Sequence, residues 1–188
     1  CRASFRQAYT VMPQSYIKRI LNARVYDVAR ETPIDEARLV SQRLGNRILL
    51  KREDMQPVFS FKCRGAFNKL AQLSREQLDR GVIAASAGNH AQGLALAAAT
   101  LKVKAIIVMP KTTPSIKVEA VKSRGAKAIL FGDTFEEAVA HARELVETRG
   151  YIYIPPYDDP DIIAGQGTVG VEIVRQLSHP PDAIFIPV

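Results

Sequence analysis

The chain has 188 residues, of which 47% are hydrophobic, so it is long enough to bury the core of one medium domain or two small ones. Its formal net charge of +7 comes from 26 basic and 19 acidic residues, and the basic residues are dispersed rather than gathered in one run. This pattern argues against a nucleic-acid partner, and the absence of any apolar run near the roughly 20 residues that span a bilayer argues against a membrane partner.

Cysteine content and the N-terminal composition bear on the compartment. The two cysteines, Cys1 and Cys63, are too few for a disulfide framework, which predicts a reducing compartment such as the cytoplasm. Residues 1–26 carry five basic residues and no acidic one, so they also fit the remnant of a transit peptide to a plastid or mitochondrion. Because the chain starts with a cysteine and stops directly after the strand-like run 184–188, we expect it to be a fragment.

The first 60 residues show short and irregular patterns. They predict helices over 16–22, 25–29 and 36–44, the last one stopped by Gly45, and a short buried strand over 47–50.

From residue 74 helices and strands alternate regularly. Ser74 with Gln77, and Thr134 with Glu137, form the capping-box pattern at two helix starts. Strands are predicted over 82–85, 104–109, 126–131, 151–154 and 183–186, and helices over 74–81, 91–101, 113–125 (capped by Thr113), 134–149 and from 159 onward. This alternation predicts an α/β fold with a parallel sheet, whose ligands bind beyond the carboxyl ends of the strands. We therefore expect the functional site in the loops at 86–90, 110–114, 132–134 and 155–160.

Lys62 lies in the first turn of a helix predicted to follow Ser60, whose hydroxyl can accept the free N–H groups of that turn. A cation there opposes the helix dipole, which is consistent with an amine of lowered pKa. A neutral amine is what Schiff-base chemistry requires, whereas the alternative is a solvated surface lysine. Cys63 lies about 100° round the helix from Lys62, so we expect it to pack rather than react.

Two glycine-containing stretches are candidate sites. Ser86-Ala87-Gly88-Asn89-His90 joins an apolar strand to an alanine-rich helix, where small residues and a helix N-terminus suit an anion, although an ordinary turn has the same pattern. Gly165-Gln166-Gly167-Thr168 is predicted to be a turn that breaks a helix and allows tight packing. We find neither a P-loop nor a ligand spacing for a metal, and we expect no metal site.

Four motifs in a fixed order carry a resemblance to a known family. They are Lys51-Arg52-Glu53-Asp54 with Gln56-Pro57, Ser60-Phe61-Lys62 with Arg64-Gly65-Ala66, Ser86-Ala87-Gly88-Asn89-His90-Ala91-Gln92-Gly93, and Ile163-Ala164-Gly165-Gln166-Gly167-Thr168. Together they resemble the pyridoxal-phosphate enzymes of the tryptophan-synthase-β fold (fold type II), most closely the biosynthetic threonine dehydratases, over about residues 16–188. The resemblance implies a truncated two-domain α/β architecture: 1–80 and 163–188 would be incomplete parts of the larger domain, 81–162 would form the smaller one, and the regulatory domain would be absent.

The resemblance also implies roles for individual residues. Lys62 would hold pyridoxal 5′-phosphate covalently and later take the Cα proton of the substrate. Phe61 and Asn89 would contact the cofactor, with Asn89 bonding its phenolic oxygen. The N–H groups of the 86–90 loop, formed by Ser86, Ala87, Gly88, Asn89 and His90, would hold the substrate carboxylate. The phosphate-binding tetraglycine loop, the serine at the pyridine nitrogen and the domain that senses isoleucine are expected beyond residue 188.

The implied reaction is dehydration and deamination of L-threonine to 2-oxobutanoate and ammonia, the first step of isoleucine biosynthesis, with L-serine giving pyruvate. The alternatives are another enzyme of the same fold (catabolic serine/threonine dehydratase, serine racemase, threonine or cysteine synthase) and a non-catalytic α/β module that binds a phosphate-bearing ligand. Serine racemases carry a proton-transferring serine where this chain has Ala87, so the resemblance favours elimination. It also implies a homo-oligomer, a tetramer, and we expect the 188 residues alone to be inactive.

Overall fold

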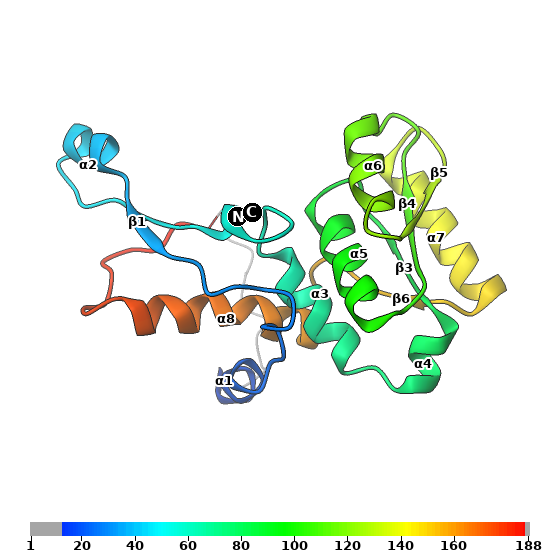
Figure 1. The fold of residues 1–188 in the computed structure, drawn as a ribbon, viewed down its shortest axis with the longest axis horizontal. Coiled ribbons are helices and arrows are strands. Elements are labelled where there is room, and N and C mark those ends of the chain that lie inside the picture. Colours follow the sequence, from blue (N-terminus) through cyan, green and yellow to red (C-terminus); the bar gives the residue numbers. More distant parts are fainter. Residues whose placement is uncertain (1–12, 187–188) are drawn as a thin grey trace, which may run out of the picture.

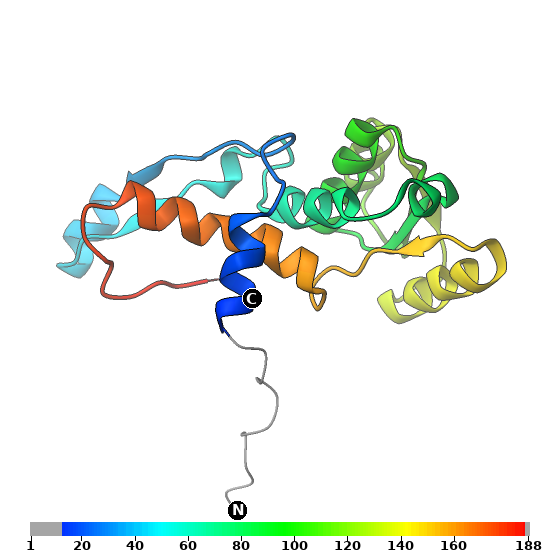
Figure 2. The same cartoon turned by 90° about the horizontal axis from the view of Figure 1, so that it is seen from below.

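The structure is a computed structural model that describes residues 13–186 (Figures 1 and 2). Its elements are α1 (Pro13–Leu21), β1 (Ile34–Glu36), α2 (Arg38–Leu44), β2 (Leu49–Lys51), the 3₁₀ helix η1 (Glu53–Met55), α3 (Lys62–Ala71), α4 (Arg75–Arg80), β3 (Val82–Ala85), α5 (Asn89–Leu101), β4 (Ala105–Met109), α6 (Ser115–Lys122), β5 (Lys127–Leu130), α7 (Phe135–Arg149), β6 (Ile152–Tyr153) and α8 (Pro160–Gln176). Helix α3 lies between two groups of elements: α1, α2, α8, β1 and β2 on one side, and β3 to β6 with their helices on the other (Figure 1).

Strands β3 to β6 form a parallel sheet in the order β5-β4-β3-β6. Alternate side chains of β3 enter two different clusters: Val82 and Ala84 belong to the core that contains α5, whereas Ile83 and Ala85 pack with Ala138 of α7. Helices therefore cover both faces of the sheet, as the alternating pattern predicted, and the α/β fold class is confirmed. Because β6 pairs with β3, the loops that follow these two strands leave the sheet side by side.

Local signals at the helix ends agree with the structure. Both capping boxes are present, at Ser74 with Gln77 and at Thr134 with Glu137. Arg80 Nε donates to the carbonyl oxygen of Gly150 at the end of α7 at 2.7 Å. A cation stabilises the negative end of a helix, so part of the excess of basic residues is explained by contacts within the molecule.

Several predicted boundaries in the first half of the chain are wrong. Residues 25–29 form a turn rather than a helix. The side-chain amide of Gln56 accepts a hydrogen bond from the N–H of Arg30 and donates one to its carbonyl oxygen, so neither backbone group of Arg30 is left to continue a helix. The predicted helix over 36–44 starts only at Arg38, since the residues before it pair as β1 with β2. Strand β2 is not buried: Leu50 is 48% exposed.

Three further predictions in the second half also need correction. Helix α5 starts at Asn89 rather than at 91, so Asn89 and His90 lie in its first turn. Helix α6 has Pro114 in the cap position with no side-chain cap, so the predicted Thr113 cap is wrong. Residues 183–186 do not form a strand, because no described strand pairs with them; Phe185 is 93% exposed.

The stretch 165–168, predicted as a helix-breaking turn, lies inside the continuous helix α8. A Cβ at Gly165 would lie 2.6 Å from the Cα of Gly65, so the backbones of α3 and α8 cross in direct contact. Gln166 Oε1 accepts a hydrogen bond from the N–H of Gly65 at 3.1 Å. Glycine at 165 therefore allows two helices to approach, and only the tight-packing half of the prediction was right.

We expect Gly165→Ala to destabilise the full-length protein by about 1–3 kcal/mol, because its new methyl group would overlap backbone atoms that have no room to move. Gly170→Ala in the same helix is the matched control, since a Cβ there meets nothing within 4 Å. That control should stabilise by up to about 1 kcal/mol through helix propensity. Denaturant unfolding measures both, and equal effects at the two positions would contradict the close crossing of α3 and α8.

Candidate functional site

The backbone of Lys62 is held where helix α3 begins. Its N–H donates to Ser60 Oγ at 3.2 Å, as expected for a serine at this helix start. Helix α5 packs against the same turn: a Cβ at Gly93 would lie 2.9 Å from the carbonyl carbon and oxygen of Lys62. Gly93, in the second turn of α5, thus allows this helix to approach the lysine backbone, which brings two of the predicted motifs together.

The side chain of Lys62 reaches the segment between β6 and α8. Lys62 Nζ donates to the carbonyl oxygen of Pro156 at 2.9 Å and lies 4.4 Å from the ring centre of Tyr157. The centre of the Phe61 ring is 5.6 Å from Lys62 Nζ. Burial lowers the pKa of the Lys62 amine, so the lowered pKa that the sequence suggested is present, with loss of solvation as its cause.

His90 ties the start of α5 to the same segment. Its Nε2 lies 3.1 Å from the carbonyl oxygen of Ile154, which only accepts, so Nε2 carries the proton. Burial, together with the nearby charge of Lys62, lowers the pKa of His90 to about 4. His90 Nδ1 is buried without a hydrogen-bond partner among the described residues. A neutral histidine therefore stands beside Lys62 with one unused acceptor.

The remaining residues of the 86–90 loop show graded exposure. Ser86 is buried and its Oγ accepts the N–H of Gly88 at 3.3 Å. Ala87 and Gly88 are half-buried, and Asn89 is exposed as the first residue of α5. The loop thus presents a helix N-terminus and a serine hydroxyl next to His90, a combination that suits a carboxylate.

The structure adds the segment Ile154–Tyr157 to the site, which no motif had singled out. It follows β6, and the expected location beyond the carboxyl ends of the strands was the only signal for it. Because β6 neighbours β3 in the sheet, this segment lies against the loop after β3. Lys62, His90 and the segment come from three distant parts of the chain and meet here.

A buried ion network explains the Lys51-to-Asp54 motif. Arg64 is fully buried, and its guanidinium lies 2.8 Å from Glu53 and 2.6 Å from Glu172. Lys51 Nζ is 2.6 Å from Glu172, and Arg64 Nη1 donates to Thr168 Oγ1 at 3.1 Å. Burial alone would raise the pKa of Glu172, but its bonds with Arg64 and Lys51 outweigh this and lower it. Residues from three of the four sequence motifs therefore take part in the link between α3 and α8.

Cys63 shares the first turn of α3 but faces the core, as expected. It is fully buried, and burial raises the pKa of its thiol to about 11. A thiol of raised pKa is a poor nucleophile, so its position serves packing.

The stability of the full-length protein should fall as the pH drops from 7 to 5, in part because of His90. Its folded pKa of about 4 lies below its ordinary value of 6.5, so between these values the unfolded chain binds a proton that the folded chain does not. Linkage gives a loss of about 2 kcal/mol in the free energy of unfolding from this group between pH 7 and pH 5. Denaturant unfolding of the protein and of its His90→Gln variant measures the difference in pH dependence. Identical pH dependence in both would contradict a buried neutral His90.

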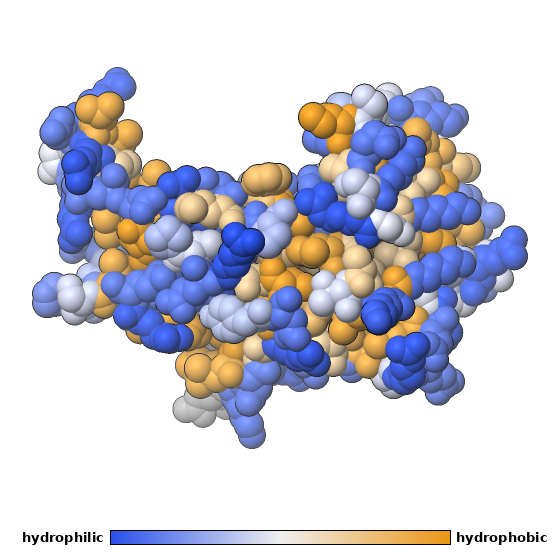
Figure 3. All heavy atoms as spheres, viewed as in Figure 1, coloured by the Kyte–Doolittle hydropathy of each residue, from blue (hydrophilic) through white to orange (hydrophobic). Residues whose placement is uncertain are grey.

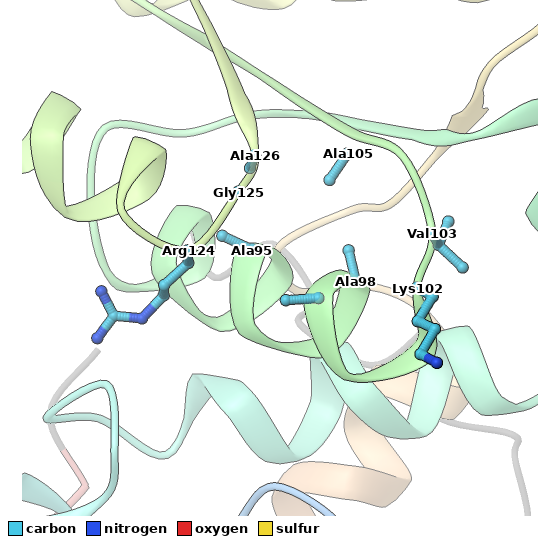
Figure 4. A pocket seen from close by; sticks show the side chains of 9 residues that line it. Ala95, Ala98, Lys102, Val103, Ala105, Arg124, Gly125 and Ala126 are labelled. Atoms are coloured by element: carbon cyan, nitrogen blue, oxygen red, sulfur yellow. The ribbon is translucent and has the colours of Figure 1, made fainter.

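Other features of residues 13–186 lie outside this site. A cavity of about 130 Å³ between α5 and the turn after α6 is at the opposite end of α5 from Asn89 (Figure 4). Within the described range, no three His, Cys, Asp or Glu residues are grouped to hold a metal ion. None of the helices in that range combines the length and the apolar character needed to cross a membrane.

Comparisons with known proteins place the chain in a family. A family model described as "Pyridoxal-phosphate dependent enzyme" matches residues 25–188. The chain is 56% identical over 173 residues to the biosynthetic, chloroplastic threonine dehydratase of Arabidopsis thaliana, covering 92% of this chain and 29% of that protein. It is 54% identical over 176 residues to the biosynthetic L-threonine dehydratase of Burkholderia multivorans, covering 92% of this chain and 35% of that protein. The chain thus spans only about a third of the length of these relatives.

Solved structures show the same similarity. The processed form of threonine deaminase isoform 2 from Solanum lycopersicum superposes with a TM-score of 0.86 at 55% identity, over 91% of this chain and 47% of that one. Serine racemase from Dictyostelium discoideum superposes with a TM-score of 0.80 at 33% identity, over 87% of this chain and 54% of that one.

Proposed function

The chain belongs to the family of pyridoxal-phosphate-dependent enzymes, and from this premise we propose that it is part of a biosynthetic threonine dehydratase. The full-length protein would convert L-threonine to 2-oxobutanoate and ammonia, and L-serine more slowly to pyruvate. The observation that carries this proposal is the half-buried amine of Lys62, of lowered pKa, held beside a helix N-terminus. Identity of 56% to a relative named threonine dehydratase supports the substrate.

The residues around Lys62 fit the cofactor of this family. Burial favours the neutral amine, which is the form that attacks an aldehyde. His90 Nδ1 offers a buried acceptor without a partner at the same place. Bound pyridoxal phosphate supplies an electron sink that acidifies the Cα–H bond of an amino acid attached to it. We assign contacts with the cofactor to Lys62, Phe61 and Asn89.

Lys62 would act as the base of the reaction. Its neutral Nζ takes the proton from the substrate Cα, and the Pro156 carbonyl accepts an N–H of the amine. The substrate carboxylate would bind at the N-terminus of α5, beside the Ser86 hydroxyl and the N–H groups of Ala87, Asn89 and His90. The backbone N–H of Ser86, expected to take part, donates instead to the Val108 carbonyl at 3.0 Å, and that of Gly88 donates to Ser86 Oγ at 3.3 Å. The helix dipole favours a negative charge there and so orients the Cα–H bond toward Lys62.

Ala87 bears on the choice between elimination and racemisation. A methyl group cannot donate a proton to the face of the substrate opposite Lys62, so the Cβ hydroxyl would leave instead. Serine racemisation remains the second candidate, because a serine racemase shares the fold at 33% identity.

The test is product analysis of the full-length protein with pyridoxal phosphate. L-Threonine should give 2-oxobutanoate, L-serine should give less pyruvate, and neither should racemise appreciably. Ala87→Ser is the matched variant, and we expect it to gain measurable D-serine formation. If the unaltered protein formed D-serine faster than pyruvate, the dehydratase assignment would be wrong.

We also propose how the protein is divided into domains, how many copies assemble and in which compartment it lies. We divide it into a smaller domain over 81–162 and parts of a larger domain over 1–80 and 163–188, which limited proteolysis tests. We propose a homotetramer, and light scattering of the full-length protein tests it. Apolar side chains exposed on α2, where Leu39 is 82% and Leu44 is 56% exposed, are available for burial in a larger assembly (Figure 3). For the compartment we propose the cytoplasm, or a plastid or mitochondrion if the basic residues 1–26 are the remnant of a transit peptide. Residues 1–12 lie outside the described range, and a fluorescent fusion of the full-length protein distinguishes these compartments.

A further inference from the structure

The segment Ile154–Tyr157 is arranged as a set of acceptors for a cation. Pro155 and Pro156 have no backbone N–H, so this stretch offers carbonyl oxygens without competing donors. The N–H of Ile154 is used in a bond to the carbonyl of Ile83 at 2.9 Å, which extends the pairing of β6 with β3. The ring of Tyr157 completes the set, with its centre 4.4 Å from Lys62 Nζ.

His90 keeps this segment in place. It donates through Nε2 to the carbonyl of Ile154, while Lys62 donates to the carbonyl of Pro156, two residues further along. The two acceptors lie within three consecutive residues, so His90 and Lys62 hold the same short stretch of backbone. His90 thereby sets the position of the oxygen atom that Lys62 uses.

We propose that the Pro156 carbonyl and the Tyr157 ring form a resting site for the Lys62 ammonium group, positioned by His90. This inference rests on the proposed function, in which Lys62 takes a proton from the substrate. At that moment the C–H bond breaks, its electron pair stays with the substrate, and Nζ gains a positive charge. A carbonyl oxygen accepts from either form of the amine, whereas the face of an aromatic ring selectively stabilises the cation.

No carboxylate competes for this role among the described residues, since Lys62 has no ion pair within residues 13–186. On α3, Arg64 is occupied by Glu53 and Glu172. At the start of α8, Asp159 pairs with Lys69 at 2.7 Å.

The other groups near Lys62 do not neutralise its charge. Asp158, next to Tyr157, is exposed to solvent and is not ion-paired with Lys62 in the described part of the chain. His90 on α5 stays neutral above about pH 4. Of the two aromatic rings that face Lys62 Nζ, that of Tyr157 is nearer, with its centre at 4.4 Å against 5.6 Å for Phe61. Removing the Tyr157 ring should therefore change the stability of the ammonium without removing a charge.

Competitive acetylation of the cofactor-free, full-length protein tests this proposal. Acetic anhydride reacts with neutral amines, so the pH dependence of Lys62 labelling, read by peptide mass spectrometry, gives its midpoint. Lys117, exposed on α6, serves as an internal standard in the same sample. Tyr157 is 70% exposed, so its substitution should leave the fold intact.

We expect Tyr157→Leu to lower the midpoint of Lys62 by about 0.4–0.7 pH unit, the effect of losing a cation–π contact at an exposed site. Tyr157→Phe keeps the ring face and should leave the midpoint in place. An unchanged midpoint in Tyr157→Leu, or an equal shift in both variants, would overturn the resting site.

Kinetics of the holoenzyme place the site in the reaction. Tyr157→Leu should lower kcat for L-threonine by roughly twofold to fivefold with little change in KM, because the ring stabilises the amine only once the amine is charged. An unchanged kcat would show that the resting site does not contribute to turnover. Acetylation of Lys62 requires no cofactor and no turnover. The Tyr157 variants therefore test the resting site independently of the dehydratase assignment, which is tested by product analysis.

Discussion

Replacing Lys62 with alanine is expected to lower turnover of L-threonine by at least about 10³-fold, because one side chain serves as both the attachment point of the cofactor and the base. Lys62→Arg should not restore activity, since a guanidinium stays protonated and takes no proton. Formation of 2-oxobutanoate measures both variants.

Borohydride reduction gives the independent check on Lys62. Reduction of the full-length holoenzyme followed by peptide mapping should place the pyridoxyl label on this residue. Lys117→Ala, on the exposed face of α6, is the control and should behave like the unaltered protein. A label on another lysine, or substantial turnover by Lys62→Ala, would show that the site has been placed at the wrong residue.

Arg64→Met is expected to destabilise the full-length protein by about 3–5 kcal/mol, the second large effect. The change leaves the carboxylates of Glu53 and Glu172 without their buried partner, and an uncompensated buried charge is costly. The sequence neighbour Arg52 provides the matched control. It pairs with Asp35 and Asp54 in a solvent-accessible position, so Arg52→Met should cost less than about 1 kcal/mol.

Denaturant unfolding compares the two arginine variants, and a double-mutant cycle refines the result. Glu172→Gln in the Arg64→Met background should cost less than the same change in the unaltered protein, because the carboxylate has already lost one of its two cationic partners and keeps only Lys51. Equal losses for Arg64→Met and Arg52→Met would contradict the buried network. If the prediction holds, the start of α3, two residues from Arg64, owes its rigidity to this network.

Much of the parallel sheet and its helices could be predicted from the sequence alone. Capping boxes such as Ser74 with Gln77 act between residues three apart, and the apolar strands 82–85 and 104–109 repeat a local pattern. The sequence likewise pointed to Lys62 and to the loop after β3, since a lysine at a helix start and small residues after a strand are local features. The roles of these residues stay predictions.

Only the tertiary structure decided what these residues meet. Pro156 lies 94 residues from Lys62 along the chain, and Glu172 lies 108 residues from Arg64. The same holds for Gly165, which a local reading placed in a turn and which in fact lets α8 cross α3. Sequence periodicity reports hydrogen bonds and burial over a few residues, whereas a helix crossing, a buried ion pair or a cation on a ring is set by how distant elements pack.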